Sequence, residues 1–158
     1  MLLLFLLTMA RAESFSVARY FTGSDKCDLE ALGSVFITAI AGEKCSSPVI
    51  KPCRSQGGTD YHVSAEVACV DELPSLEGYV VMYTYASANC TGPPTLITGK
   101  RTFHCTMYHT YTCGDEEVRA TRYETPDCGS PAGSYETKTA VGRCSAMPGG
   151  GSVVTRCQ

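Results

Sequence analysis

Short apolar runs rich in Val, Thr and Tyr recur along the chain, and Gly, Pro and Ser bound most of them. Such runs are typical of β-strands. Between residues 79 and 85, three tyrosines and Val81 occupy alternate positions on one face, while Val80 and Met82 occupy the other. Apolar side chains on both faces predict a central strand that is covered on both sides.

Several segments of the chain resemble one another, which indicates an internal repeat. The segment GSVFITAIAGEKC at 33–45 and the segment GSYETKTAVGRC at 133–144 both begin Gly-Ser and end on Gly followed closely by Cys. A third copy lies between them, where PTLITGKRTFHC ends at Cys105 as the second strand of its unit. Later copies follow at intervals of roughly 40 residues, which is typical of arrays and pseudo-symmetric folds.

The pattern predicts an all-β, disulfide-rich, mainly antiparallel domain at 13–158. We expect three internal units of about three strands, near 14–69, 79–113 and 116–157, arranged with pseudo-threefold symmetry or as a β-sandwich-like pair of sheets. A helix is plausible only at 28–41, where apolar residues are dense, and the repeat favours a strand there too. The polar segment 70–77, interrupted by Pro74, is the expected linker.

Nine of the ten cysteines fall into three sets of three by this repeat. The first positions are Cys27, Cys90 and Cys128, the second are Cys45, Cys105 and Cys144, and the third are Cys69, Cys113 and Cys157, with Cys53 left over. If the units are equivalent, two of them should share one type of bridge, and the first unit can depart from it by using Cys53. Three cysteines per unit is an odd number, so complete pairing must join different units or use Cys53. The connectivity itself stays open.

The first twelve residues predict a signal peptide. An apolar run from Leu2 to Leu7 precedes Ala10-Arg11-Ala12, the small-x-small pattern that a signal peptidase cleaves, so the expected new N-terminus is Glu13. The alternative is a buried N-terminal strand. An even number of cysteines, all after the leader, is typical of an oxidising compartment, and we therefore expect a secreted, extracellular protein.

Charge excludes one class of partner. The net charge is −3 and no basic cluster exceeds Lys100-Arg101, whereas a nucleic-acid surface needs a concentrated positive patch. After the leader, no apolar stretch is long enough to span a bilayer. We therefore expect neither nucleic acid nor a membrane span.

No motif in the chain predicts catalysis or a cofactor. There is no Gly-x-Ser-x-Gly elbow, and the one acidic run, Asp115-Glu116-Glu117, is best interpreted as a solvated turn. The cluster of His104, Cys105 and His109, with His62, could hold a metal. Cys105 is expected to be a disulfide partner instead, and the two histidines would point to opposite faces of a strand. We expect no metal site.

Two features of the sequence are compatible with an attached or a bound sugar. Asn89-Cys90-Thr91 is a glycosylation sequon, placed at a loop edge by the Gly-Pro-Pro that follows. Tyr108 and Tyr111 flank His109 and could stack on a sugar, although packing between strands is the simpler interpretation.

The repeated Tyr-x(4–6)-Cys, with its Gly/Pro loops and Gly-x-Cys, resembles segments of uncharacterised secreted cysteine-rich repeat proteins of single-celled eukaryotes. The similarity covers residues 20–157 as a pattern, and it implies no activity and no functional residues.

The expected function is that of a secreted, non-enzymatic structural or binding protein with a rigid extracellular β scaffold, whose partner is a protein or a glycan. One alternative is a carbohydrate-binding, lectin-like module. Another is a secreted inhibitor or effector, for which Gly92-Pro93-Pro94 and Gly149-Gly150-Gly151 are candidate loops.

Overall fold

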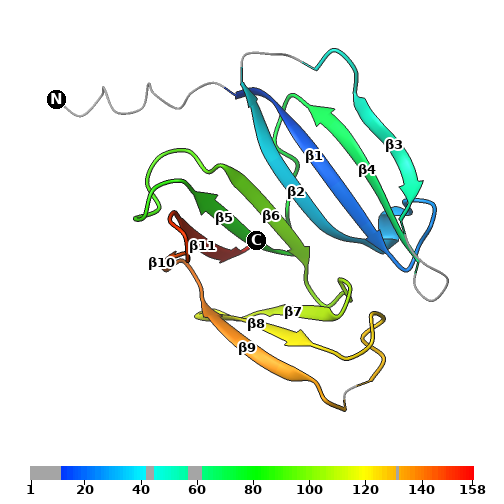
Figure 1. Ribbon diagram of the computed structural model, residues 1–158, viewed down its shortest axis with the longest axis vertical. Coiled ribbons are helices and arrows are strands. Elements are labelled where there is room, and N and C mark those ends of the chain that lie inside the picture. The colour runs from blue at the N-terminus through cyan, green and yellow to red at the C-terminus, as the bar shows by residue number, and fades with distance from the viewer. Residues whose placement is uncertain (1–11, 42–44, 57–61, 131) are drawn as a thin grey trace.

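The protein is all-β, as predicted. The computed structural model describes residues 12–41, 45–56, 62–130 and 132–158. These residues form eleven β-strands and one 3-10 turn, η1 (Leu29–Ala31), with no α-helix among them. Neighbouring strands pair in the antiparallel sense, and in the described residues the one parallel contact is an isolated bridge between Val141 and Thr155. The strands form one sheet of eight and one sheet of three (Figure 1).

One half of the large sheet is built from consecutive strands. They are β1 (Ala12–Thr22), β2 (Leu32–Ala41), β3 (Val49–Ser55) and β4 (Val63–Val70), and their order in the sheet is β2-β1-β4-β3. The apolar segment at 28–41 is therefore η1 followed by a strand, as the repeat indicated. Its dense Val, Phe and Ile side chains are β-formers that pack well on a pleated surface.

The other half joins strands that are distant in sequence. They are β5 (Tyr79–Tyr85), β6 (Leu96–Arg101), β10 (Cys144–Ala146) and β11 (Ser152–Cys157), in the order β6-β5-β11-β10. As predicted, β5 is a central strand, and both Val80 and Val81 are buried. The two halves meet where β2 pairs with β6 over four residues of each strand.

The small sheet has the order β7-β8-β9, with strands at His109–Cys113, Glu117–Arg122 and Tyr135–Ala140. It lies beside the half of the large sheet that contains β5, β6 and β11 (Figure 1). The Cys113–Cys157 disulfide links β7 to β11 and so fastens the two sheets together.

The main core lies on one face of the large sheet, across the junction of its halves. It consists of Val17, Val35, Ile37, Leu76, Val81 and Ile97. Leu76 comes from the segment 70–77 that the sequence indicated as a linker. That segment therefore does more than connect, because it covers the core with an apolar side chain that is only 8% exposed.

All ten cysteines are paired, in five bridges: Cys27–Cys53, Cys45–Cys69, Cys90–Cys144, Cys105–Cys128 and Cys113–Cys157. Cys53, and not Cys45, is therefore the partner of the first cysteine in the chain. Two bridges lie within residues 14–69, and the other three each connect the expected second unit with the expected third.

The expected organisation in three units is not confirmed. The large sheet is not divided at the unit boundaries, because β5 pairs with β11 of the expected third unit and β6 pairs with β2 of the expected first unit. The expected leader at 1–12 lies outside the described residues except for Ala12, where β1 begins.

Candidate binding site at the 102–108 loop

Seven residues, Thr102 to Tyr108, connect β6 of the large sheet with β7 of the small one, and we call them the 102–108 loop. Backbone hydrogen bonds hold the loop at both ends. The Thr102 N–H donates to Gly78 O at 2.9 Å, the Phe103 N–H to Tyr111 O at 3.0 Å, and the Thr106 N–H to His109 O at 2.7 Å. The loop is therefore anchored to both sheets.

Three bulky residues of this loop have left-handed backbone conformations. The φ angles of Phe103, Met107 and Tyr108 are 57°, 49° and 68°. In this region the Cβ atom crowds the backbone, which costs on the order of 1 kcal/mol or more per residue, and glycine or asparagine is the usual occupant. The surrounding hydrogen bonds and the disulfide hold these residues in an unfavourable conformation.

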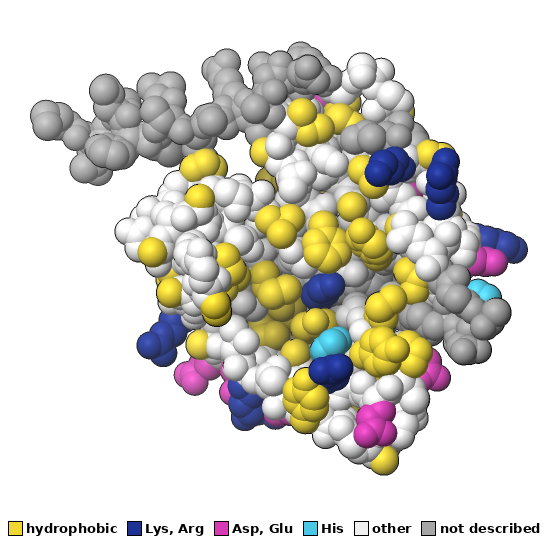
Figure 2. Space-filling view, viewed as in Figure 1, with side chains coloured by type: hydrophobic (Ala, Val, Ile, Leu, Met, Phe, Trp, Pro, Cys, Tyr) yellow, Lys and Arg dark blue, Asp and Glu magenta, His cyan; other side chains and the backbone are white. Residues whose placement is uncertain are grey.

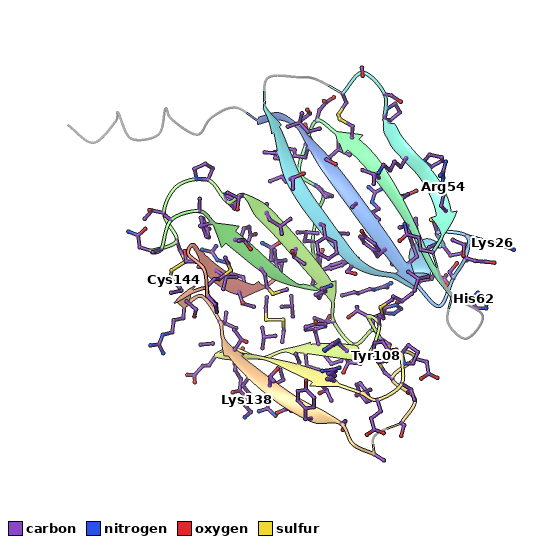
Figure 3. The ribbon with its side chains drawn as sticks, in the orientation of Figure 1. Lys26, Arg54, His62, Tyr108, Lys138 and Cys144 are labelled. Carbon is purple, nitrogen blue, oxygen red and sulfur yellow. A yellow bond between two sulfur atoms is a disulfide. The ribbon has the colours of Figure 1, made fainter. Side chains whose placement is uncertain are left out.

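The centre of the loop is fastened covalently. Cys105 is bonded to Cys128, in the segment that follows β8. The Tyr108 N–H donates to Pro126 O at 3.3 Å, and Tyr108 O accepts from the Tyr123 N–H at 2.7 Å. Figure 3 shows Tyr108 at the end of the small sheet, beside this disulfide-linked segment.

The loop also contacts the far end of β1. The Thr22 hydroxyl donates to Cys105 O at 2.7 Å and lies 3.1 Å from His104 Nε2. Burial lowers the pKa of His104, and the nearby Arg101 charge lowers it further. The neutral imidazole of His104 is therefore favoured.

The side chains in left-handed conformations are exposed. Phe103 is 81% exposed, Met107 44% and Tyr108 38%, three of the six large hydrophobic side chains that stand out in this way among the described residues. Figure 2 shows hydrophobic side chains gathered where the two sheets meet, with Lys, Arg and His side chains among them. The loop thus presents apolar side chains from a backbone that is held in place.

The strands on either side of the loop carry two partly buried polar side chains, Lys100 on β6 and Tyr111 on β7. The Lys100 amino group lies 4.9 Å from the centre of the Phe36 ring, and burial lowers the pKa of Lys100. Burial also raises the pKa of Tyr111, opposed by a hydrogen bond with Thr106. Among the described ion pairs, Lys100 has no carboxylate partner.

The structure does not assemble the metal ligands that the sequence offered. Cys105 is in a disulfide, His109 Nδ1 lies 3.2 Å from Met107 O, and His62, labelled in Figure 3, is exposed directly before β4. Within the described ranges, no three His, Cys, Asp or Glu side chains gather as a metal site would require.

The sugar-related residues are separated. Asn89 is exposed in the segment before β6, whereas the loop follows β6, and its Oδ1 accepts from the Thr91 hydroxyl at 2.7 Å. His109 and Tyr111 stack on one another with ring centres 6.2 Å apart, so each covers a face of the other. Tyr108 lies in the loop and contributes to the exposed apolar surface instead.

The two loops that the sequence offered for inhibition lie elsewhere. Gly92-Pro93-Pro94 connects β5 with β6, and Gly149-Gly150-Gly151 connects β10 with β11. Sequence reasoning missed the 102–108 loop because it expected a strand to continue to Cys105. The strand ends at Arg101, and no Gly, Pro or Asn marks the turn.

Comparison with protein-family models, with curated proteins and with solved structures finds no match to this chain. The fold alone defines the class, a disulfide-rich all-β protein. Five disulfides indicate an oxidising, extracellular type of environment. In the part of the chain that the structure describes, no helix has the length and apolar character to cross a membrane.

Proposed function

We propose that this is a secreted, non-enzymatic binding protein whose rigid β scaffold presents the 102–108 loop to an extracellular protein. The observation that carries the proposal is the conjunction of strain and exposure at Phe103, Met107 and Tyr108. A left-handed backbone and an exposed apolar side chain are each unfavourable for folding alone. Strained residues concentrate at ligand-binding and active sites.

The construction of the loop suits recognition. Association costs conformational entropy when a loop must become ordered, and a loop already fixed by a disulfide and by hydrogen bonds at both ends loses less. Aromatic side chains and methionine are enriched at protein interfaces, where they bury large areas in pockets of the partner.

The same residues favour a protein over a glycan. Sugar recognition needs polar groups placed beside an aromatic face, and the exposed side chains of Phe103 and Met107 have no hydrogen-bond donor. Tyr108 adds a single hydroxyl, and the neighbouring His109 and Tyr111 rings stack on each other. An inhibitor or effector is a special case of this proposal, in which the protein partner is an enzyme or a host protein.

Site-specific photo-crosslinking tests the proposal. A photoreactive amino acid is placed at position 103 or 107, and at Leu73 as the control, since Leu73 is also 50% exposed but lies outside the loop. Each protein is added to the extracellular fluid of the producing cells. We expect the same protein to be crosslinked from 103 and from 107 and not from 73.

Competition makes the result specific. Excess unlabelled wild-type protein should abolish the crosslink, whereas a Phe103→Ser, Met107→Ser, Tyr108→Ser variant with unchanged thermal stability should not. Equal crosslinking from Leu73, or full competition by the triple variant, would overturn the role of the loop. Turnover of a substrate by the purified protein, abolished by one substitution, would overturn the non-enzymatic part.

A further inference from the structure

Three strand trios in this protein have the same arrangement. Each has a middle strand, β1, β5 or β8, followed by a turn with a left-handed cysteine: Cys27, Cys90 and Cys128, with φ angles of 55°, 55° and 57°. The chain then returns as an outer strand, β2, β6 or β9. The strand on the other side of the middle one is β4, β11 or β7, which contain Cys69, Cys157 and Cys113.

Two of the three outer strands pair with each other. β2 and β6 form the antiparallel junction that unites the halves of the large sheet. β9 is the third outer strand, and in the described part of the chain its only neighbour is β8. An odd number of trios thus leaves one outer strand without the partner that the other two have.

The free edge of β9 is regular. All six residues are exposed, and the strand pairs with β8 without a bulge. The Val141 N–H bonds to Glu116 O, so by the alternation of an antiparallel ladder the backbone groups of Glu136, Lys138 and Ala140 point away from β8. Figure 1 shows β9 at the rim of the molecule.

The remaining edges are less suited to pairing. β3 contains Pro52 and two irregularities, and β10 has only three residues. The outward carbonyls of His109 and Tyr111 on β7 already accept hydrogen bonds from the 102–108 loop. Such features are the usual protection of a sheet edge.

The junction between β2 and β6 predicts a register for β9. The three trios can be aligned on one equivalent pair of facing residues. In each trio, the residue five positions before the cysteine of β4, β11 or β7 faces a residue of the middle strand. These pairs are Ser64 with Phe21, Ser152 with Tyr85, and Tyr108 with Tyr123. The middle-strand residue two positions before this pair faces Val35 on β2, Ile97 on β6 or Glu136 on β9, so these three residues are equivalent. The middle-strand residue four positions before it faces Ile37, Gly99 or Lys138, which are equivalent in the same way.

In the junction, Val35 faces Gly99 and Ile37 faces Ile97. Transferred to two copies of β9, this register sets Glu136 of each copy opposite Lys138 of the other. Two opposite-charge pairs result, related by a twofold axis through Thr137. The register comes from the apolar β2–β6 junction alone, and the charge complementarity of β9 is an independent observation.

The geometry points to β9 as a self-recognition edge, through which two copies of this chain join their three-stranded sheets into one antiparallel sheet of six. Lys138 already lies 3.2 Å from Glu117 on β8, so its ammonium group would lie between Glu117 and the partner's Glu136. Figure 3 shows Lys138 on this outer strand. This inference is independent of the 102–108 loop.

Charge reversal tests the register. By analytical ultracentrifugation from about 10 µM to about 1 mM, we expect a concentration-dependent dimer. E136K and K138E each place like charges opposite one another in both pairs, and we expect association at least roughly tenfold weaker. The double variant E136K/K138E restores both pairs and should dimerise as the wild type does.

Mixing provides the sharpest form of this test. E136K and K138E are complementary to each other, so an equimolar mixture should form heterodimers more readily than either variant forms homodimers alone. The control is D115K, which carries the same net charge as E136K but changes the turn between β7 and β8, and it should dimerise normally and gain nothing from mixing. Circular dichroism and thermal unfolding verify that every variant folds.

A crosslink tests the alignment without changing charge. In the proposed register Thr137 faces itself across the axis, in a pair without backbone hydrogen bonds, where Cα atoms are about 4.5 Å apart and within disulfide range. Mild oxidation should convert T137C to a covalent dimer. T139C would face the partner's Tyr135 and should remain uncrosslinked.

Opposite results would overturn the inference. A wild-type protein that is monomeric at every concentration would show that the charges on β9 prevent pairing, the common role of charged residues on edge strands. Single reversals that associate as well as the wild type, or equal crosslinking of T137C and T139C, would exclude the register.

Discussion

The two halves of the large sheet share one local contact between a cysteine and a serine, but their strands are separated by different lengths of chain. In the half with β1–β4, the Cys27 N–H donates to Ser64 Oγ at 2.9 Å, and in the half with β5 and β11 the Cys90 N–H donates to Ser152 Oγ at 2.8 Å. Both serines are fully buried. In both halves, a cysteine with a left-handed backbone in the turn after the middle strand is therefore held by a hydrogen bond to a buried serine.

The halves differ in what separates their strands. Cys27 and Cys53 are 26 residues apart, whereas Cys90 and Cys144 are 54 apart and enclose the whole small sheet. Because closing a longer loop costs more conformational entropy, the second half depends more on its covalent bridge. The comparison shows that strand order in the sheet can be preserved while order in the chain changes, at an entropic cost.

The largest expected effect is removal of the bridge over the long loop. In the chain-entropy model, loss of the Cys90–Cys144 bridge by double substitution to Ser costs about 4 kcal/mol, and loss of Cys27–Cys53 about 3.5 kcal/mol. Urea unfolding without reductant measures both. A larger loss for Cys27–Cys53 would mean that loop length does not distinguish the halves.

The junction between the halves is tested at Gly99. A Cβ at this position would lie 2.6 Å from Val35 Cγ2, so Gly99→Ala overpacks the contact of β6 with β2 and should cost about 2 kcal/mol. Adding Val35→Ala removes the clashing methyl group. The double variant should lose less stability than the sum of the single variants, and strict additivity would contradict a steric clash as the cause.

The hydrogen bonds to the buried serines predict a smaller difference in stability between the two halves. Ser64→Ala leaves the Cys27 N–H without its acceptor and should cost about 1–2 kcal/mol. Ser152 also donates to Ser87 O at 2.6 Å, so Ser152→Ala loses two bonds and should cost about 1 kcal/mol more. Chemical denaturation of both variants decides, and equal losses would show that the bond to Ser87 adds nothing.

The smallest effect is a pH dependence at His104, which meets Thr22 of the first half from the loop that follows β6. Because burial lowers the pKa of His104 in the folded state, the unfolded chain binds the proton more readily below the usual pKa of 6.5. Stability is therefore full above that pH and declines as the pH falls through the lowered folded-state pKa.

His104→Gln should remove this component of the decline between pH 7 and pH 5, measured as the change in unfolding midpoint. His109→Gln, which removes a neighbouring imidazole, is the control. A slope that persists in His104→Gln would assign the pH dependence to other groups.

Much of the fold could be predicted from local patterns. The period-two pattern around Val80 and Val81 identified β5 as a central strand, and the recurrence of GSVF- and GSYE-type segments favoured a strand at 28–41 over a helix. These features depend on neighbouring residues, so the sequence carries them directly. The cysteine content likewise indicated a disulfide-rich protein.

The candidate site could not be predicted this way. The expected strand up to Cys105 is cut short at Arg101, and left-handed Phe103, Met107 and Tyr108 contradict local preference. Their conformation is imposed by partners far along the chain, including Thr22 and Cys128. No local pattern encodes such a constraint.

The amino-acid sequence by itself determined that the chain forms short strands, where most of them lie, and that cysteines recur at their ends. Only the tertiary structure decided which strands pair and that Cys53, not Cys45, joins Cys27. It also decided that β5 pairs with β11, although the strands of the small sheet lie between them in the sequence. Strand formation follows from side-chain period and branching, which are local. Pairing is a choice among distant segments, and it is settled by which arrangement buries the common core and closes every bridge.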